Sequence, residues 1–186
     1  MKNKNSILFI IKFLILFNVL YWGTFILIGI SSPGNYYSPF VSQYLDYVSW
    51  LRMSLMKGAS VIAQLFGFLT VYEPDYLLRV LNGRGVIIAY DCAGYGVMSF
   101  WTAFILTWPS ALSFRVKWLF SGLFILWLIN VLRIGLFLVA INKSWKMPLG
   151  IDHHTWFNIV SYFFIFTMMY YFNRNDEKRD AQKNIS

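Results

Sequence analysis

The stretch WLFSGLFILWLINVLRIGLFLVAI, residues 118–141, is apolar throughout except for a few small or polar side chains and a single charge, Arg133. About 20 apolar residues in a helix cross the hydrocarbon core of a bilayer, so this stretch predicts a transmembrane helix. Three further segments predict spans in the same way: roughly Ile7–Ile30, about Ala93–Trp108, and Thr155–Phe172.

Composition supports this interpretation. Hydrophobic residues make up 58% of the 186 residues and charged residues 13%, which leaves too little polar surface to cover a soluble domain of this size. We therefore expect an all-α polytopic membrane protein with about four transmembrane helices. The chain forms a single membrane domain, residues 1–186. Its first span, 1–30, resembles a signal peptide, but its apolar run is too long and it lacks a cleavage site, so we interpret it as an uncleaved helix.

Residues 44–92 have a different pattern. Between Tyr44 and Val71 apolar residues recur every three or four positions, which predicts an amphipathic helix at the membrane interface. The sequence YLLRVLNGRGVIIAYD that follows predicts a short β-hairpin, because Asn82-Gly83 suits a tight turn with positive φ. We expect this helix and hairpin to be extracytoplasmic, followed by a three-helix core over residues 93–172.

The charge distribution predicts the orientation. The net charge of +8 comes from basic residues near loop ends and both termini, without the basic-aromatic patch of a nucleic-acid-binding protein. With the N-terminus inside, nine Lys and Arg residues fall on the cytoplasmic side and six on the other. Residues 173–186 are then a cytoplasmic tail, and we expect no nucleic-acid partner.

Three polar side chains are predicted to reach one depth. At about 1.5 Å per helical residue, Cys92 and Arg133 lie roughly 24 Å above the cytoplasmic edge and His154 roughly 27 Å. A cation inside a span costs roughly 2.5–3.5 kcal/mol, so Arg133 requires an explanation, and Asn130 shares its helix face. A cysteine nucleophile, a histidine acid/base and an oxyanion-stabilising arginine would together catalyse acyl transfer at the outer face.

Structural interpretations compete with this one. A single membrane cysteine is usually inert packing, and an arginine near the end of a span can snorkel to the interface. The chain would then be a non-enzymatic scaffold or transporter subunit. A metal or redox protein could use the paired histidines with Cys92 and the neighbouring carboxylates, but no ligand-spacing motif supports it, and we expect neither metal nor cofactor. The candidates for this third interpretation are Asp91, Asp152, His153 and His154.

Three motifs in this order resemble the exosortase/archaeosortase family: DCAGYGVMSFW, NVLRIGLF and DHHTWFNIVSYFF. The resemblance runs from about Trp50 to Phe172. It implies an integral membrane cysteine transpeptidase or protease that cleaves C-terminal sorting signals, which consist of a short motif, a transmembrane helix and a basic tail. By position, Cys92 corresponds to the nucleophile, Arg133 to the essential arginine and His154 to the third member. His153 is the alternative, and Phe157 and Asn158 favour His154 by their spacing.

The resemblance also implies partners and a location. The partners would be exported proteins that carry such a sorting signal, together with membrane lipids, and the location a bacterial inner membrane with the site facing outward. Two departures stand out: many members have about eight spans, and Ala93 replaces the small polar residue that is common after the cysteine. Gly94 and Gly96 are interpreted as leaving room for a substrate helix beside the thiol.

Overall fold

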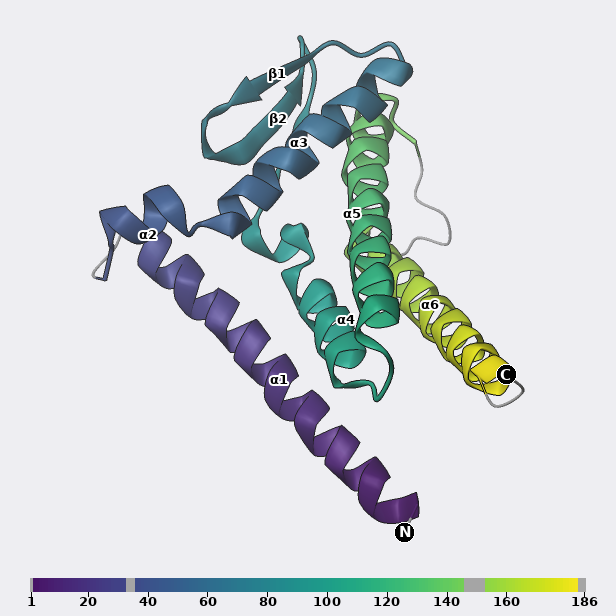
Figure 1. Cartoon of the computed structure of the whole chain (residues 1–186). Helices are drawn as coiled ribbons and strands as arrows, with labels where there is room; N and C mark the ends of the chain where they lie inside the picture. Colours follow the sequence, from purple (N-terminus) through teal and green to yellow (C-terminus); the bar gives the residue numbers. More distant parts are fainter. Residues whose placement is uncertain (1, 33–35, 146–152, 184–186) are drawn as a thin grey trace.

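The computed structural model describes residues 2–32, 36–145 and 153–183, which are mostly helical (Figure 1). Both ends of the chain lie at one end of the helical bundle, and a small sheet lies at the other. The helices are α1 (Lys2–Ser31), α2 (Pro39–Tyr44), α3 (Tyr47–Leu65), α4 (Tyr95–Thr107), α5 (Leu112–Asn142) and α6 (His153–Lys183), and the strands are β1 (Thr70–Glu73), β2 (Leu77–Val80) and β3 (Gly85–Ile87). Two 3-10 turns, η1 (Pro74–Tyr76) and η2 (Tyr90–Ala93), complete the order.

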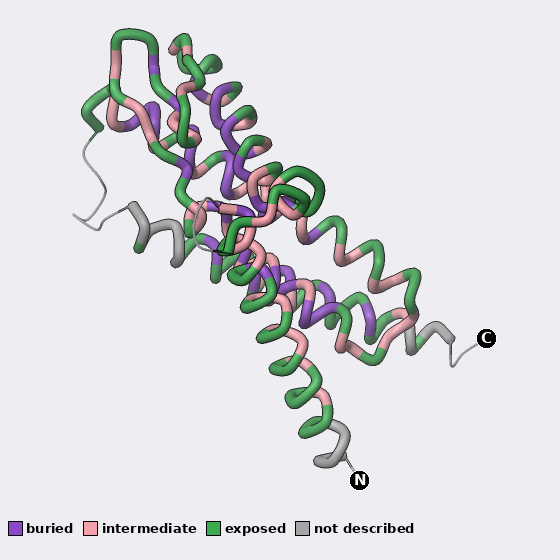
Figure 2. Tube along the Cα trace, turned by 90° about the vertical axis from the view of Figure 1, so that its left-hand side faces the viewer, coloured by how far each residue is buried: buried purple, intermediate pink, exposed green. Residues whose placement is uncertain are grey.

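Among the described residues, two helices are long and apolar enough to cross a bilayer: residues 6–31 of α1 and the whole of α5. Most of α1 is exposed (Figure 2). Its exposed residues include large aliphatic side chains along its length. Helix α4 is apolar but only 13 residues long. The predicted spans in α1 and α5 are thus present as helices of sufficient length, and crossing by α4 and α6 stays a prediction.

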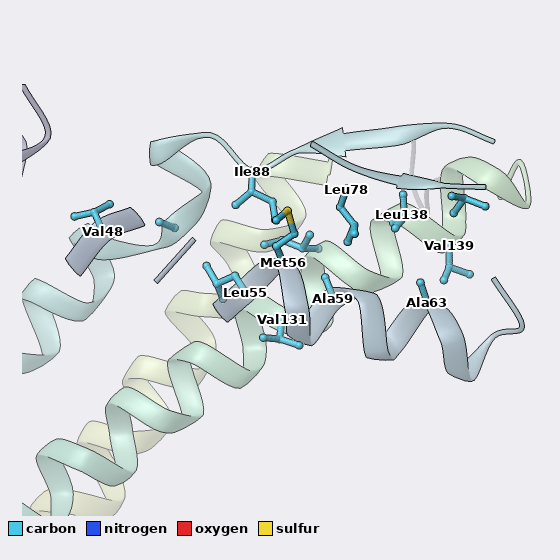
Figure 3. Packing of buried hydrophobic residues seen from close by; sticks show 13 residues of the cluster. Val48, Leu55, Met56, Ala59, Ala63, Leu78, Ile88, Val131, Leu138 and Val139 are labelled. Carbon is cyan, nitrogen blue, oxygen red and sulfur yellow. The ribbon is translucent and has the colours of Figure 1, made fainter. Parts of the chain in front are cut away.

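The main core lies where α3 crosses the upper part of α5 beneath the sheet (Figure 3). Two glycines allow the close approach: a Cβ on Gly58 would lie 2.7 Å from a methyl group of Val131, and one on Gly135 would lie 2.5 Å from the Cβ of Ile62. Helix α3 therefore packs along one face against α5 and the sheet. The core residues that Figure 3 labels are Val48, Leu55, Met56, Ala59, Ala63, Leu78, Ile88, Val131, Leu138 and Val139.

The predicted amphipathic helix is present, but its predicted end is wrong. It ends at Leu65 rather than Val71 because Gly67 adopts φ +83°. The Phe68 amide donates to the Ala63 carbonyl (3.1 Å) and the Gly67 amide to the Gln64 carbonyl (2.9 Å), the hydrogen-bond pair of a Schellman cap. The chain then turns directly into β1.

The predicted hairpin is confirmed as β2 and β3, which pair antiparallel with Leu78 opposite Val86. In the connecting turn Asn82 has the positive φ (59°) that the prediction requires, whereas Gly83 does not adopt positive φ. The sheet has a third strand that the sequence pattern did not reveal, since β1 pairs antiparallel with β2 in the order β1-β2-β3. Buried Leu78 anchors the sheet in the core beside α3.

A second core, rich in aromatic side chains, holds the opposite ends of α4, α5 and α6 together. Trp101 is fully buried and lies directly over Gly122 of α5, where any side chain would collide with its ring. Phe172 of α6 packs against Phe114 and Trp118 of α5, with ring centroids 5.2 and 5.6 Å away. This cluster sets the relative height of α5 and α6.

Candidate functional site

Cys92 lies in η2, the single turn between the sheet and α4. Its amide donates to the Ala89 carbonyl (3.0 Å), and its side chain is partly exposed. Gly94 follows in the left-handed conformation, φ +75°, and forms the N-cap of α4. The thiol is therefore at a helix start on a tight turn, and not within a regular helix.

Asn130 of α5 joins this turn to the core. Its Nδ2 donates to the Cys92 carbonyl (2.8 Å), and only 1% of the residue is exposed. A Cβ on Gly94 would lie 3.2 Å from that Nδ2, so glycine suits this position through both its φ and its small size. The Asn130 Oδ1 is buried without a hydrogen-bond partner among the described residues.

Arg133 lies one helical turn beyond Asn130 and is partly buried. Its guanidinium is close enough to Cys92 for an electrostatic interaction between the two side chains. The η2 turn and the Asn130–Arg133 face of α5 thus lie side by side, whereas the depth of these residues in a membrane stays a prediction. A cation beside a thiol is the setting in which cysteine becomes a nucleophile.

The histidines open α6, the helix beside α5. Asp152 lies outside the described residues, as do the side chains of His153, His154 and Asn158. The backbone of α6 is described from His153 onward, so the position of His154 along the bundle can be compared with that of Arg133. His154 is about 27 Å along α6 from Phe172, and Arg133 is about 22 Å along α5 from Trp118, which contacts Phe172. The start of α6 therefore lies at about the height of Arg133.

Arg52 is the feature that the sequence analysis missed. It is 6% exposed, and its Nε donates to the carbonyl of Ile88 (2.7 Å). The rings of Tyr76 and Tyr90 flank its guanidinium, with centroids 3.7 and 4.2 Å away. The Tyr90 hydroxyl in turn lies 2.9 Å from the Ser32 hydroxyl at the end of α1. This cluster fixes the segment that leads into Cys92, and it was recognisable because Arg52 occupies the apolar face of the amphipathic pattern.

The space beside Gly96 is filled by the chain itself. A Cβ there would lie 3.3 Å from the Tyr21 ring of α1, and Gly94 packs against Asn130. The interpretation that these two glycines leave room for a substrate helix is therefore wrong for the present arrangement. An open, largely apolar groove of about 660 Å³ lies nearby, bounded by α1, α3, α4 and α5, with Tyr95 and Ser99 of α4 among its lining residues.

No group of three or more His, Cys, Asp or Glu side chains is placed to hold a metal within the described ranges, and Asp91 is exposed there.

Comparison of the chain with protein-family models, curated proteins and solved structures finds no match in any of the three. The family resemblance therefore stays a prediction from the motifs.

Proposed function

We propose that this chain is a membrane-embedded cysteine protease or transpeptidase that cleaves C-terminal sorting signals of exported proteins at the outer face of the membrane. The observation that carries the proposal is the hydrogen bond by which Asn130 holds the Cys92 turn to α5, one helical turn from Arg133 on the same helix. An inert packing cysteine has no need of a cation beside it, whereas a nucleophile does.

The chemistry follows from these roles. His154 takes the proton from the Cys92 thiol, and the thiolate attacks the scissile carbonyl carbon, forming a C–S bond. Arg133 stabilises the resulting oxyanion. When the C–N bond breaks, His154 returns the proton to the leaving amine and a thioester remains on Cys92. An amine acceptor or water then attacks the thioester, the C–S bond breaks and the thiol is restored.

The surroundings suit a substrate that carries an apolar helix. The groove bounded by α1, α3, α4 and α5 is mostly apolar, and Tyr95, three residues after the nucleophile, lines it. Its polar groups include Thr24 and Tyr47, whose hydroxyls hydrogen-bond each other, and Ser54, which accepts from the Trp127 indole (3.0 Å). A transmembrane helix in this groove would bring the residues at its outer end to the Cys92 turn.

The orientation of the proposed enzyme follows from charge. Helix α1 exposes apolar side chains that a bilayer would cover. Both chain ends lie at the end of the bundle where α5 begins, and Arg115 and Lys117 are in the first turns of α5. By the positive-inside rule this end is cytoplasmic, so Cys92 faces the outer side of a bacterial inner membrane. Labelling of Cys92 in intact cells by a membrane-impermeant maleimide tests this orientation. Labelling only after the cytoplasmic side is opened would contradict it.

Processing of C-terminally anchored surface proteins in cells tests the activity. Cys92→Ser, Arg133→Lys and His154→Ala should each abolish cleavage while the chain remains in the membrane at its normal level. His153→Ala serves as the matched control for His154, and the two results also decide which histidine is the acid/base. If Cys92→Ser, Arg133→Lys and the two histidine variants all process these proteins normally, the enzyme proposal is refuted.

The competing functions give different results. A scaffold or transporter subunit would tolerate Cys92→Ser but lose membrane level or assembly when Arg133 is replaced. A metal or redox protein using the paired histidines would retain a stoichiometric metal after purification, and His153→Ala would release it.

A further inference from the structure

A second cavity, of about 580 Å³, lies at the end of the bundle away from Cys92. It is bounded by α1, the turn between α4 and α5, and the last part of α6. Its lining is mainly polar, in contrast to the groove near the thiol. Three basic side chains from three helices line it: Lys12, Arg115 and Arg179. The cysteine chemistry proposed above makes no use of this cavity.

One carboxylate lies next to the cavity, and its hydrogen-bonding capacity is taken up by the protein. Asp176 is 7% exposed and accepts from the Trp108 indole (2.8 Å) and the Ser110 hydroxyl (2.8 Å). It also pairs with Arg179 (2.6 Å), whose guanidinium lies over the Phe114 ring with 4.6 Å to the centroid. Asp176 therefore offsets the charge of Arg179 and holds the α4–α5 turn against α6.

The other two cations are not offset in this way. Among the described residues, neither Lys12 nor Arg115 forms an ion pair. Arg115 donates one bond, from a terminal nitrogen to the Leu106 carbonyl (2.7 Å), and its Nε is buried without a hydrogen-bond partner. The first turn of α5 adds to the positive potential, because its N-cap, Ala111, lines the cavity and provides no side-chain cap. The cavity thus presents two uncompensated charges and a helix N-terminus to one space.

We propose that this cavity binds the phosphate group of an anionic membrane lipid. Guanidinium groups, ammonium groups and the amides of a helix N-terminus are the donors that bind phosphate in proteins. A lipid fits better than free phosphate because apolar side chains flank the basic ones and remain exposed: Ile11 on α1 at 48% and Leu112 on α5 at 66%. Acyl chains would cover these side chains while the headgroup occupies the cavity.

The test uses the purified full chain in a neutral detergent and measures the rise in Tm on titration with phosphatidylglycerol, phosphatidylcholine or inorganic phosphate. Phosphatidylglycerol should raise Tm at the lowest concentration. One basic residue near an anionic surface is worth about a fivefold change in affinity, so Lys12→Gln should raise the half-saturating concentration about fivefold and Lys12→Gln with Arg115→Gln about 25-fold. The matched control is Lys57→Gln with Arg84→Gln, at the other end of the molecule, which should leave the titration unchanged.

The outcomes separate the sources of phosphate. An equal rise with inorganic phosphate alone would replace the lipid with a free anion, and an equal rise with phosphatidylcholine would overturn the proposal. If the control variant loses as much of its Tm response to phosphatidylglycerol as the cavity variants do, the lipid is attracted by overall charge and not by this site. Lys12 is exposed, so its substitution leaves the fold intact and the comparison remains decisive even where Arg115→Gln unfolds. Cleavage activity plays no part in this readout, so the proposed enzymatic function can fail without affecting it.

Discussion

Replacing Arg52 with methionine should destabilise the protein and loosen the turn that carries Cys92. Methionine fills similar space but cannot donate to the Ile88 carbonyl, which is buried, or lie as a cation between Tyr76 and Tyr90. A hydrogen bond from a charged donor contributes about 1.5–3 kcal/mol and each buried cation–π contact about 1–2 kcal/mol. The methionine variant no longer has the desolvation cost of a buried guanidinium, which offsets part of this loss. The free energy of unfolding should therefore fall by about 2–4 kcal/mol.

Two measurements on purified protein in detergent test this reasoning. Chemical unfolding gives the loss of stability, and the rate of maleimide labelling under native conditions reports how freely Cys92 is exposed. Labelling of Arg52→Met should be several-fold faster than that of the wild type. Lys57→Met is the matched control, because Lys57 is exposed on the same helix. Arg52→Lys should fall between the two, since an ammonium group keeps the charge but loses the planar stacking.

Two results would refute the argument. Equal stability of Arg52→Met and Lys57→Met would show that the buried cluster contributes nothing net. A large loss of stability with unchanged Cys92 labelling would show that Arg52 supports the core but does not hold the η2 turn.

Three other substitutions test separate features by thermal or chemical unfolding. Gly67→Ala should cost about 1 kcal/mol, because φ +83° is unfavourable for alanine, and an unchanged unfolding midpoint would contradict the cap. Gly58→Ala should cost about 1–3 kcal/mol by pushing α3 from α5, and Val131→Ala, which removes the methyl groups in the way, should recover part of it in the same chain; additive losses would exclude this contact. Asp176→Leu leaves the Trp108 indole without its acceptor and should cost about 1–3 kcal/mol, whereas Asp176→Asn should cost less; equal losses would show that the carboxylate acts only by charge.

The sequence predicted the parts of the fold that depend on local pattern. The apolar runs of α1 and α5 and the Asn82-Gly83 turn each lie within a short window, so their signals are complete in the sequence. The end of α3 was mispredicted because Leu69 continues the helical spacing beyond Gly67, and only the positive φ of that glycine breaks it. Strand β1 is as short as β2, but it joins β2 through the 3-10 turn η1 and not through an Asn-Gly pair, so no turn signal marks it.

In the candidate site, too, the features that depend on local pattern were predictable and those that depend on tertiary contacts were not. Helical rise predicts a shared height for Cys92 and Arg133, and the structure brings the Cys92 turn to α5 through the Asn130 hydrogen bond. The role of Arg52 depends on Tyr76, Ile88 and Tyr90, which reach it only after the sheet has folded back over α3. The sequence shows only that Arg52 falls on the apolar face of its helix; no single window of sequence identifies these partners.

The shortness of α4 has a consequence for the surrounding bilayer. Thirteen helical residues rise about 20 Å, whereas the hydrocarbon core is about 30 Å thick. If α4 crosses the bilayer, as the sequence predicts, with Trp108 at one interface, the η2 turn lies about 10 Å below the opposite interface, and the bilayer there must thin or water must enter. Such hydrophobic mismatch makes the setting of Cys92 depend on acyl-chain length. Reconstitution in lipids with progressively longer chains should therefore slow maleimide labelling of the thiol, while a cysteine introduced into the sheet of a Cys92→Ser chain would label at a constant rate.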